Sequence, residues 1–186
     1  DEKGQRWLFL SEGHRIRLAD DGLSVVGKLE HVYDGWDYPK SWKTEGKFLE
    51  SPKIIRKDGW FHMISAEGGT AGPATSHMAI SARARSLDGP WENSPHNPIV
   101  HTWSADEHWW SKGHGTLVDD GHDHWWIVYH AYENGAYPLG RQTLIEPVQW
   151  TADGWVKAAP DAPRPPDSVQ DMPLSDDFSG PALGLQ

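Results

Sequence analysis

The chain has 186 residues, with 12 Trp, 19 Gly, 14 Pro, no Cys and a formal net charge of −10. The lack of Cys excludes a disulfide framework and a thiolate metal site. The acidic balance, without a Lys/Arg cluster, excludes a nucleic-acid partner, and no apolar run approaches the ~18 residues of a membrane helix. A neutral ligand such as a sugar fits this balance, and the abundance of Trp, Gly and Pro favours an all-β fold of short strands and tight turns.

Three stretches of the chain repeat one pattern of turn residues, an aromatic residue and a mostly apolar run that ends near Glu and Gly. They are "DEKGQRWLFLSEGH" (1–14), "RKDGWFHMISAEGG" (56–69) and "DDGHDHWWIVYHAYENG" (119–135). The anchoring aromatics Trp7, Trp60 and Trp125 lie 53 and 65 residues apart. Such periods of short strands predict propeller blades. Three units do not close a propeller of ~4–8 blades, so we expect further blades upstream of Asp1.

The middle unit predicts a whole blade. "SPKIIRK" reads as a strand, Asp58-Gly59 as a hairpin turn, "WFHMISAE" as the second strand and "HMAISARARS" as the third. The turn "LDGPWENS" then leads to a short outer edge near "PIVHT". Residues 1–157 therefore form the predicted partial propeller, residues 158–173 a Pro-rich linker, and residues 174–186 the start of another domain.

Glu50 is a carboxylate at the entry of the innermost predicted strand of the middle unit. A solvent-facing Glu at a strand end is the plain interpretation. The alternative is a proton donor, because the innermost strands line a propeller channel. Apolar and aromatic neighbours (Phe48, Leu49, Trp42) would disfavour the charged form of this carboxyl group.

Four stretches of the chain carry a resemblance to glycoside hydrolase family 43. They are "LESPKIIRKDGWFHMISAEGGTA", "ARARSLDGPWENSPHNPIV", "WWSKGHGTLV" and "YPLGRQTLIEPVQWTADGW". The family comprises inverting β-xylosidases and α-L-arabinofuranosidases on a five-bladed β-propeller, of which this chain would hold roughly the last three blades. The resemblance also implies that "SDDFSGPALGLQ" opens a C-terminal β-sandwich domain.

The resemblance implies that Glu50 is the general acid. This chain has Glu50-Ser51-Pro52 where the family usually has Glu-Gly-Pro, so the backbone is less free at that point. The family's Asp base and its tuning Asp match no residue of the chain. We therefore expect the full-length protein to be a glycosidase and this fragment alone to be inactive.

His114 and Arg141 are the next candidates for the channel. His114, in "SKGHGTLV", either hydrogen-bonds in a tight turn or faces the channel. The resemblance implies a central structural Ca²⁺ near it, bound directly or through water; no organic cofactor is expected. Arg141, in "LGRQTL", either holds sugar hydroxyls or a carboxylate, or forms a buried ion pair inside the blade.

Aromatic and polar loop residues complete the candidate substrate site. Among the loop tryptophans, Trp109 and Trp110 are favoured to stack on a sugar because they closely precede His114. Glu67 and Thr70, in "SAEGGTAG", either border the sugar pocket or make an interblade turn. His96, His101, His122 and His124 are interpreted as solvated.

The sequence thus predicts an inverting hydrolase that removes xylose or arabinose residues from plant polysaccharides or oligosaccharides. The alternatives are a carbohydrate-binding propeller without catalysis and a scaffold propeller. The expected partners are a xylo- or arabino-oligosaccharide and the remaining blades, from the same or another chain, with no nucleic acid and no membrane. A secreted or periplasmic location is favoured over a cytoplasmic one.

Overall fold

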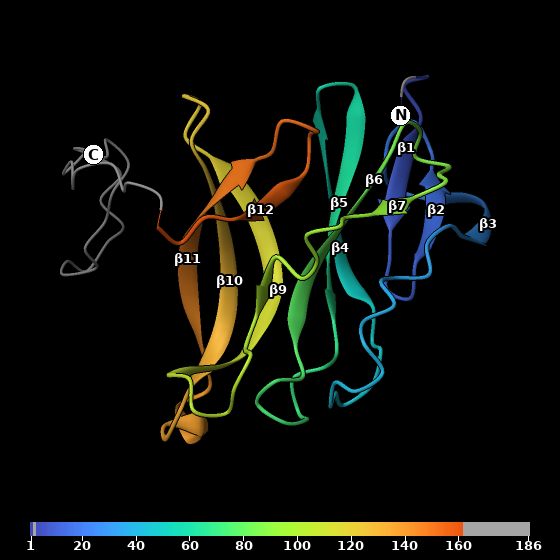
Figure 1. Cartoon of the computed structure of the whole chain (residues 1–186). Helices are drawn as coiled ribbons and strands as arrows, with labels where there is room; N and C mark the ends of the chain where they lie inside the picture. The colour runs from blue at the N-terminus through green and yellow to red at the C-terminus, as the bar shows by residue number, and fades with distance from the viewer. Residues whose placement is uncertain (2, 162–186) are drawn as a thin grey trace, which may run out of the picture.

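Three antiparallel sheets follow one another along the chain and lie side by side (Figure 1). The structure, a computed structural model, describes Asp1 and residues 3–161. The all-β prediction is confirmed: the single helical element in this part of the chain is the short 3₁₀ turn η1 (Tyr137–Leu139). No helix among the described residues is long and apolar enough to cross a membrane.

The first sheet has the order β1-β2-β3, and the second has the order β4-β5-β6-β7 with β8 also paired to β6. The third has the order β12-β11-β10-β9. The strand bounds are β1 Arg6–Phe9, β2 His14–Leu18, β3 Val25–His31, β4 Glu50–Lys57, β5 Trp60–Glu67, β6 Met78–Ala84, β7 Glu92–Asn93, β8 Val100–His101, β9 Trp109–Asp119, β10 Trp125–Glu133, β11 Arg141–Trp150 and β12 Val156–Ala158.

The three long strands predicted for the middle unit are confirmed as β4, β5 and β6. The stretch 87–94, predicted as a turn, also contains β7, because residues 92–93 pair with β6. Asp58 and Gly59 both have positive φ, 51° and 74°, as a two-residue hairpin turn of type I′ requires. Trp60 and Trp125 head the second strands of their sheets, and Trp7 lies in β1 at the edge of the first sheet. The repeated sequence pattern therefore marks equivalent positions in the second and third sheets, whereas in the first sheet it falls on the edge strand β1.

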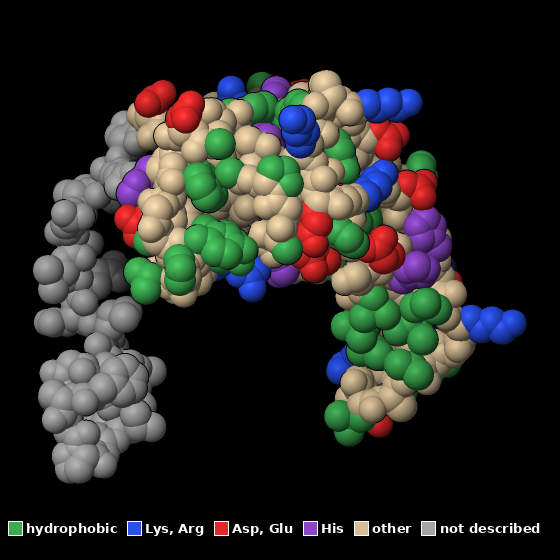
Figure 2. Space-filling model, turned by 90° about the horizontal axis from the view of Figure 1, so that it is seen from below, with side chains coloured by type: hydrophobic (Ala, Val, Ile, Leu, Met, Phe, Trp, Pro, Cys, Tyr) green, Lys and Arg blue, Asp and Glu red, His purple; other side chains and the backbone are tan. Residues whose placement is uncertain are grey.

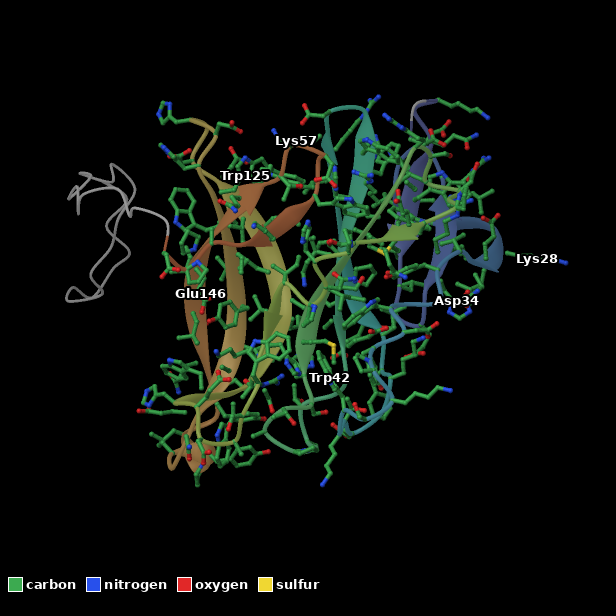
Figure 3. All side chains as sticks on the ribbon, viewed as in Figure 1. Lys28, Asp34, Trp42, Lys57, Trp125 and Glu146 are labelled. Carbon is green, nitrogen blue, oxygen red and sulfur yellow. The ribbon has the colours of Figure 1, made fainter. Side chains whose placement is uncertain are left out.

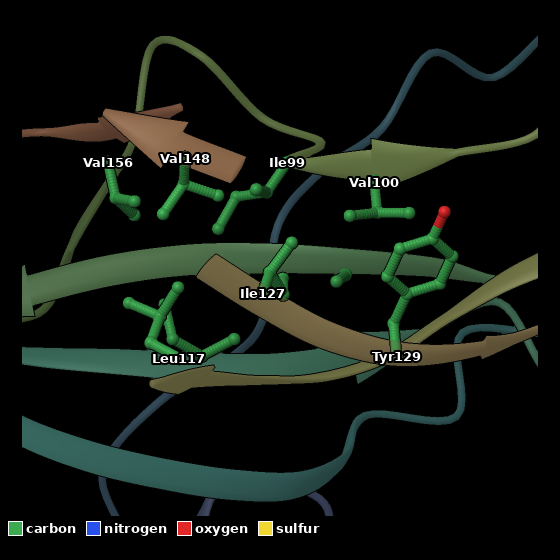
Figure 4. Packing of buried hydrophobic residues seen from close by; sticks show 9 residues of the cluster. Ile99, Val100, Leu117, Ile127, Tyr129, Val148 and Val156 are labelled. Carbon is green, nitrogen blue, oxygen red and sulfur yellow. The ribbon is translucent and has the colours of Figure 1, made fainter. Parts of the chain in front are cut away.

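Apolar cores fill the spaces between neighbouring sheets. One cluster joins Ile64 and Ala79 of the second sheet to residues of the third, among them Ile127 and Val156 (Figure 4). A second cluster joins the first and second sheets and includes Tyr33, Met63 and Ile80. Because each sheet buries a face against the next, the blades are held in sequence around an arc.

The described residues curve around a concave side, as Figure 2 shows from below. On the arm that carries the first sheet, hydrophobic side chains gather at the surface. The exposed large hydrophobic residues of this sheet and its loops are Leu8, Leu10, Leu23, Val25, Val26 and Leu29. Apolar surface of this kind is typical of a face that packs on another element.

β12 ends at Ala158, and the amide of Ala159 donates to the carbonyl of Pro147. The predicted β-sandwich start at 174–186 and most of the predicted linker lie outside the described residues.

Candidate functional site

Glu50 opens β4 and lines a cavity of about 260 Å³ at the end of the sheets. The turn after β1, the segment before β4 and the loop after β5 supply the rest of the wall. The lining residues are Ser11, Glu12, Glu45, Phe48, Glu50, Gly69 and Thr70. Of the residues predicted for the substrate site, Thr70 therefore shares a cavity with Glu50.

The backbone around Glu50 is irregular. A bulge interrupts the β4–β5 ladder between Glu50 and Lys53, and Phe48 and Ser51 have φ of 42° and 54°. Positive φ is strained for residues other than glycine, so Ser51 holds a conformation that glycine would adopt more easily. The Lys53 Nζ donates to the Ser51 Oγ.

The apolar enclosure expected for Glu50 is incomplete. Its side chain is 41% exposed. Leu49 is buried in the core between the first two sheets, whereas Phe48 is 49% exposed. Trp42 stacks on His101, with ring centroids 4.5 Å apart.

His114 lies in strand β9, not in a tight turn, and faces Glu50. Its Nδ1 lies 3.7 Å from the Glu50 Oε1. Burial, followed by the charge of Lys53, lowers the pKa of His114. A neutral imidazole at this position can donate or accept one hydrogen bond beside the carboxyl group.

Two further histidines complete an imidazole cluster with His114. The ligand nitrogens of His77, His114 and His130 all lie within 4.8 Å of one another. A Cβ at Gly113 would lie 2.1 Å from the Cδ2 of His77, so this glycine lets β9 approach His77 closely. Burial lowers the pKa of His77 to about 3 and that of His130 to about 4, with smaller contributions from Arg141 and the other histidines of the cluster.

Arg141 contacts this imidazole cluster from β11. Its Nη1 lies 3.1 Å from the Nε2 of His130, and its side chain is exposed. No ion pair of Arg141 occurs among residues 3–161. The alternative of a buried ion pair inside the blade is therefore wrong.

The imidazole cluster is a poor ligand set for calcium, which prefers oxygen. Among the side chains in contact with His114, Glu50 supplies the carboxylate oxygens. The rings of His77 and His130 stack almost parallel, at 5° and 5.3 Å, so their in-plane lone pairs do not converge on one point. Calcium held mainly by water stays a prediction, and no step proposed below passes through it.

Glu67 lies away from the cavity, contrary to its predicted contact with substrate. It has no exposed surface, and its Oε1 accepts the amide of Trp36 at 3.0 Å. A Cβ at Gly35 would lie 2.1 Å from that oxygen. Burial raises the pKa of Glu67 to about 8. The interblade-turn alternative describes Glu67 better, because its carboxyl group ties the 35–36 backbone to β5.

Trp109 and Trp110 lie at the start of β9 and are half-buried. The Trp110 Nε1 donates to the carbonyl of Ala105, and the Trp109 carbonyl accepts the Thr102 hydroxyl. Neither residue belongs to the lining of the Glu50 cavity. Their contact with sugar stays a prediction.

His101 corrects the interpretation of the outer histidines. It is 7% exposed, and its Nε2 lies 2.9 Å from the Thr75 carbonyl oxygen. It is buried because β8 pairs with β6 and turns its side chain toward Trp42. His96, His122 and His124 are exposed, as predicted.

Sequence reasoning missed the residues that surround Glu50 and His114. They are Glu12, Glu45, Lys53, His77 and His130. One signal was available for His130. If β9 and β10 pair without interruption from their turn, His130 lies opposite His114. In the structure a bulge shifts the register by one residue, and His130 lies opposite Gly113. His77 precedes β6, and its position depends on the packing of two sheets.

Comparisons with known proteins find relatives over most of the chain. A family model, "Glycosyl hydrolases family 43", matches residues 1–156. The chain is 35% identical over 153 residues to the "Non-reducing end alpha-L-arabinofuranosidase BoGH43B" of Bacteroides ovatus, covering 75% of this chain and 28% of that protein. It is 26% identical to a "Beta-xylosidase" of Bacillus subtilis, covering 100% of this chain and 39% of that protein.

A solved structure shares the arrangement of the sheets. The GH43 protein BlXynB of Bacillus licheniformis, in its K247S mutant, matches with a TM-score of 0.77 and 32% identity. The match covers 100% of this chain and 36% of that one. The chain thus spans between about a quarter and two fifths of the length of these relatives.

Proposed function

Because the chain belongs to glycosyl hydrolases family 43, we propose that the protein containing it removes xylose or arabinose residues from plant polysaccharides or oligosaccharides. The proposed chemistry is hydrolysis with inversion. The observation that carries it is the Glu50 carboxyl group, which lines an open cavity with His114 3.7 Å away.

In the proposed mechanism Glu50 protonates the glycosidic oxygen as the bond to the leaving group breaks. A water molecule attacks the anomeric carbon from the opposite face, activated by a carboxylate ~6.5–9.5 Å from the acid. The cavity wall contains Glu12 and Glu45 but no aspartate among the described residues. The family's Asp base matches no residue of this chain, and we infer that another part of the protein supplies it.

Basic groups near Glu50 have a supporting role. The charge of Lys53 helps to lower the pKa of His114. Burial lowers the pKa of Lys53 itself, and the charge of Glu50 partly offsets that shift. Positive charge fixed beside the acid stabilises the carboxylate that remains after proton transfer. Arg141 sits behind His130 and adds to this field.

The test is hydrolysis of aryl xylosides and arabinofuranosides by the full-length protein. Glu50→Gln should lower kcat at least about 100-fold on a p-nitrophenyl glycoside, since general acid catalysis contributes that much. The loss should be smaller on a 2,4-dinitrophenyl glycoside, whose leaving group needs little protonation. The matched control is Glu92→Gln, in the outer strand β7, which should retain activity.

The stereochemistry of the released sugar is a separate readout. Proton NMR of the first product should show the inverted anomer, and a retained anomer would contradict the mechanism. A carbohydrate-binding propeller is the second candidate, favoured by the absence of an aspartate from the described cavity wall. That protein would bind xylo-oligosaccharides and release no sugar. The 186-residue chain alone should be inactive in either case.

A further inference from the structure

A second cavity of about 260 Å³ lies beside the first and has mainly aromatic walls. We call it the aromatic cleft. Its lining residues are Ser41, Trp42, Lys43, Thr75, His101 and Trp103. No step of the proposed hydrolysis uses any of them.

The rings of the aromatic cleft form a corner. Trp42 and His101 stack almost parallel, at 11° and 4.5 Å. Trp103 meets the Trp42 ring at 87°, with centroids 5.5 Å apart, and meets His101 at 82° and 4.8 Å. His101 is held in place by its contact with the Thr75 carbonyl. One wall of the corner is thus rigid and packed.

Trp103 is the other wall and is 64% exposed. An indole left in water forfeits the stabilisation that burial of so large an apolar surface gives. Its position beside a packed aromatic wall provides two apolar surfaces at a right angle. A sugar ring has an apolar C–H face and a polar rim, and so matches such a corner.

Polar groups edge the aromatic cleft. The hydroxyl groups of Ser41 and Thr75 make no side-chain hydrogen bond with the residues described, and Lys43 forms no ion pair with them. These groups are available to sugar hydroxyls. The net charge of −10 favours a neutral ligand over an anionic polymer.

The aromatic cleft opens near the Glu50 cavity. A single segment of the chain lines both: Ser41, Trp42 and Lys43 in one, Glu45, Phe48 and Glu50 in the other. Figure 3 shows Trp42 toward one end of the sheets and Lys57 and Trp125 toward the opposite end. A polysaccharide whose end occupies the Glu50 cavity therefore passes close to the aromatic cleft.

We propose that the aromatic cleft is a second carbohydrate-binding site, which holds a neutral pentose residue of the polymer against Trp103. This inference rests on the proposed function for its ligand class. Its loss would weaken the binding of long substrates and leave small aryl glycosides unaffected, because these fill only the Glu50 cavity.

The test uses the full-length protein with Trp103→Ala, Trp103→Phe and the control Leu139→Ala. Leu139 is 76% exposed, lies in η1 and lines neither cavity. Isothermal titration with xylohexaose and arabinoxylan, in a Glu50→Gln background, should show about three- to tenfold weaker binding for Trp103→Ala. Trp103→Phe should recover part of the affinity, and Leu139→Ala should bind like the parent.

Kinetics separate this inference from the proposed function. With Glu50 intact, Trp103→Ala should raise KM on xylohexaose and leave kcat/KM on p-nitrophenyl xyloside unchanged. Unchanged affinity for both xylohexaose and arabinoxylan in a folded Trp103→Ala variant would show that the aromatic cleft is not a sugar site. The proposal would also be overturned if gel filtration showed a change in oligomeric state that by itself explains the weaker binding of Trp103→Ala. Failure of the parent to hydrolyse any aryl glycoside would instead contradict the proposed function.

Discussion

Glu67 holds a proton where most glutamates hold a charge. Its carboxyl group is fully buried, one oxygen accepts the Trp36 amide, and the Oε2 has no partner among the described residues. Burial raises its pKa from 4.5 to about 8. An unfolded chain releases this proton above about pH 4.5, whereas the folded protein keeps it until about pH 8. The contribution of Glu67 to stability is therefore present at low pH and lost as pH rises through this window.

Glu67→Gln should remove this pH dependence, since the amide keeps the shape and the acceptor but carries no titratable proton. We expect the variant to gain stability relative to the parent between pH 5 and pH 8, by on the order of 2 kcal/mol at the upper end. Thermal unfolding at several pH values measures the difference. Asp20→Asn, at an exposed position that follows β2, is the control, and a parallel pair of curves for Glu67→Gln and parent would contradict the prediction.

Single residues were predictable where local chemistry decides their place. The Asp58-Gly59 turn followed from the backbone freedom of its residues. Ser51 was expected to be less free than glycine, and the structure gives it a φ of 54°. The burial of Glu67 and His101 could not be predicted, because both depend on segments distant in sequence: the 35–36 backbone and Trp42.

The imidazole cluster belongs to three elements: His77 precedes β6, His114 lies in β9 and His130 in β10. His77 has no exposed surface, and neither of its ring nitrogens has a partner among the described residues. Burial lowers its pKa from 6.5 to about 3. The unfolded chain binds a proton below about pH 6.5 and the folded protein does not, so stability falls as pH falls through this window.

His77→Leu should flatten the acid side of the stability curve. The substitution removes no hydrogen bond and keeps an apolar volume between Gly113 and the neighbouring rings. We expect the loss of unfolding free energy between pH 6.5 and pH 4.5 to shrink by on the order of 2 kcal/mol. Denaturant melts at each pH give the values. The exposed His96, replaced in the same way, should retain the parent's slope; an unaltered slope in His77→Leu would exclude this role.

The strands were predictable and their irregularities were not. Runs rich in apolar and aromatic residues, bounded by turn residues, marked β4, β5, β6 and β10 from the sequence alone. The register shifts between Glu50 and Lys53 and between Val128 and His130 lie at two site residues, and no local pattern in the sequence marked them. Strands therefore follow from local pattern, and the site's geometry from contacts between blades.

At the scale of the molecule, cations join the second and third blades: Lys57 lies over Trp125 and Trp150, and Arg83 makes the shorter contacts. The Arg83 guanidinium lies 4.2 Å from the centroid of Trp60 and 3.8 Å from that of Trp155, and its Nη1 donates to the Asp153 carbonyl at 2.7 Å. Trp60 belongs to β5, and Trp155 lies beside β12 of the other sheet. A cation stacked between two indoles is a strong contact when it is shielded from water.

Arg83→Met should weaken the joint between these blades while it keeps the aliphatic stem. We expect a loss of about 1–2 kcal/mol in the free energy of unfolding and an early change in tryptophan fluorescence as Trp155 is exposed. Fluorescence and circular dichroism, followed together in urea, should separate in this variant and coincide in the parent. Arg56→Met is the control, since Arg56 lies over Phe61 within one blade; equal effects of both substitutions would contradict the assignment.

The segment from Ser41 to Glu50 is a common wall of two cavities, fastened by the Glu45 amide on Ser76 and the Ala71 amide on Glu45. A ligand in one cavity that displaces this segment changes the volume of the other cavity. Thermodynamic reciprocity then requires each ligand to change the binding affinity for the other ligand by the same factor. In a polysaccharide that occupies both cavities, the units bound in the aromatic cleft would therefore change the rate at which product leaves the Glu50 cavity.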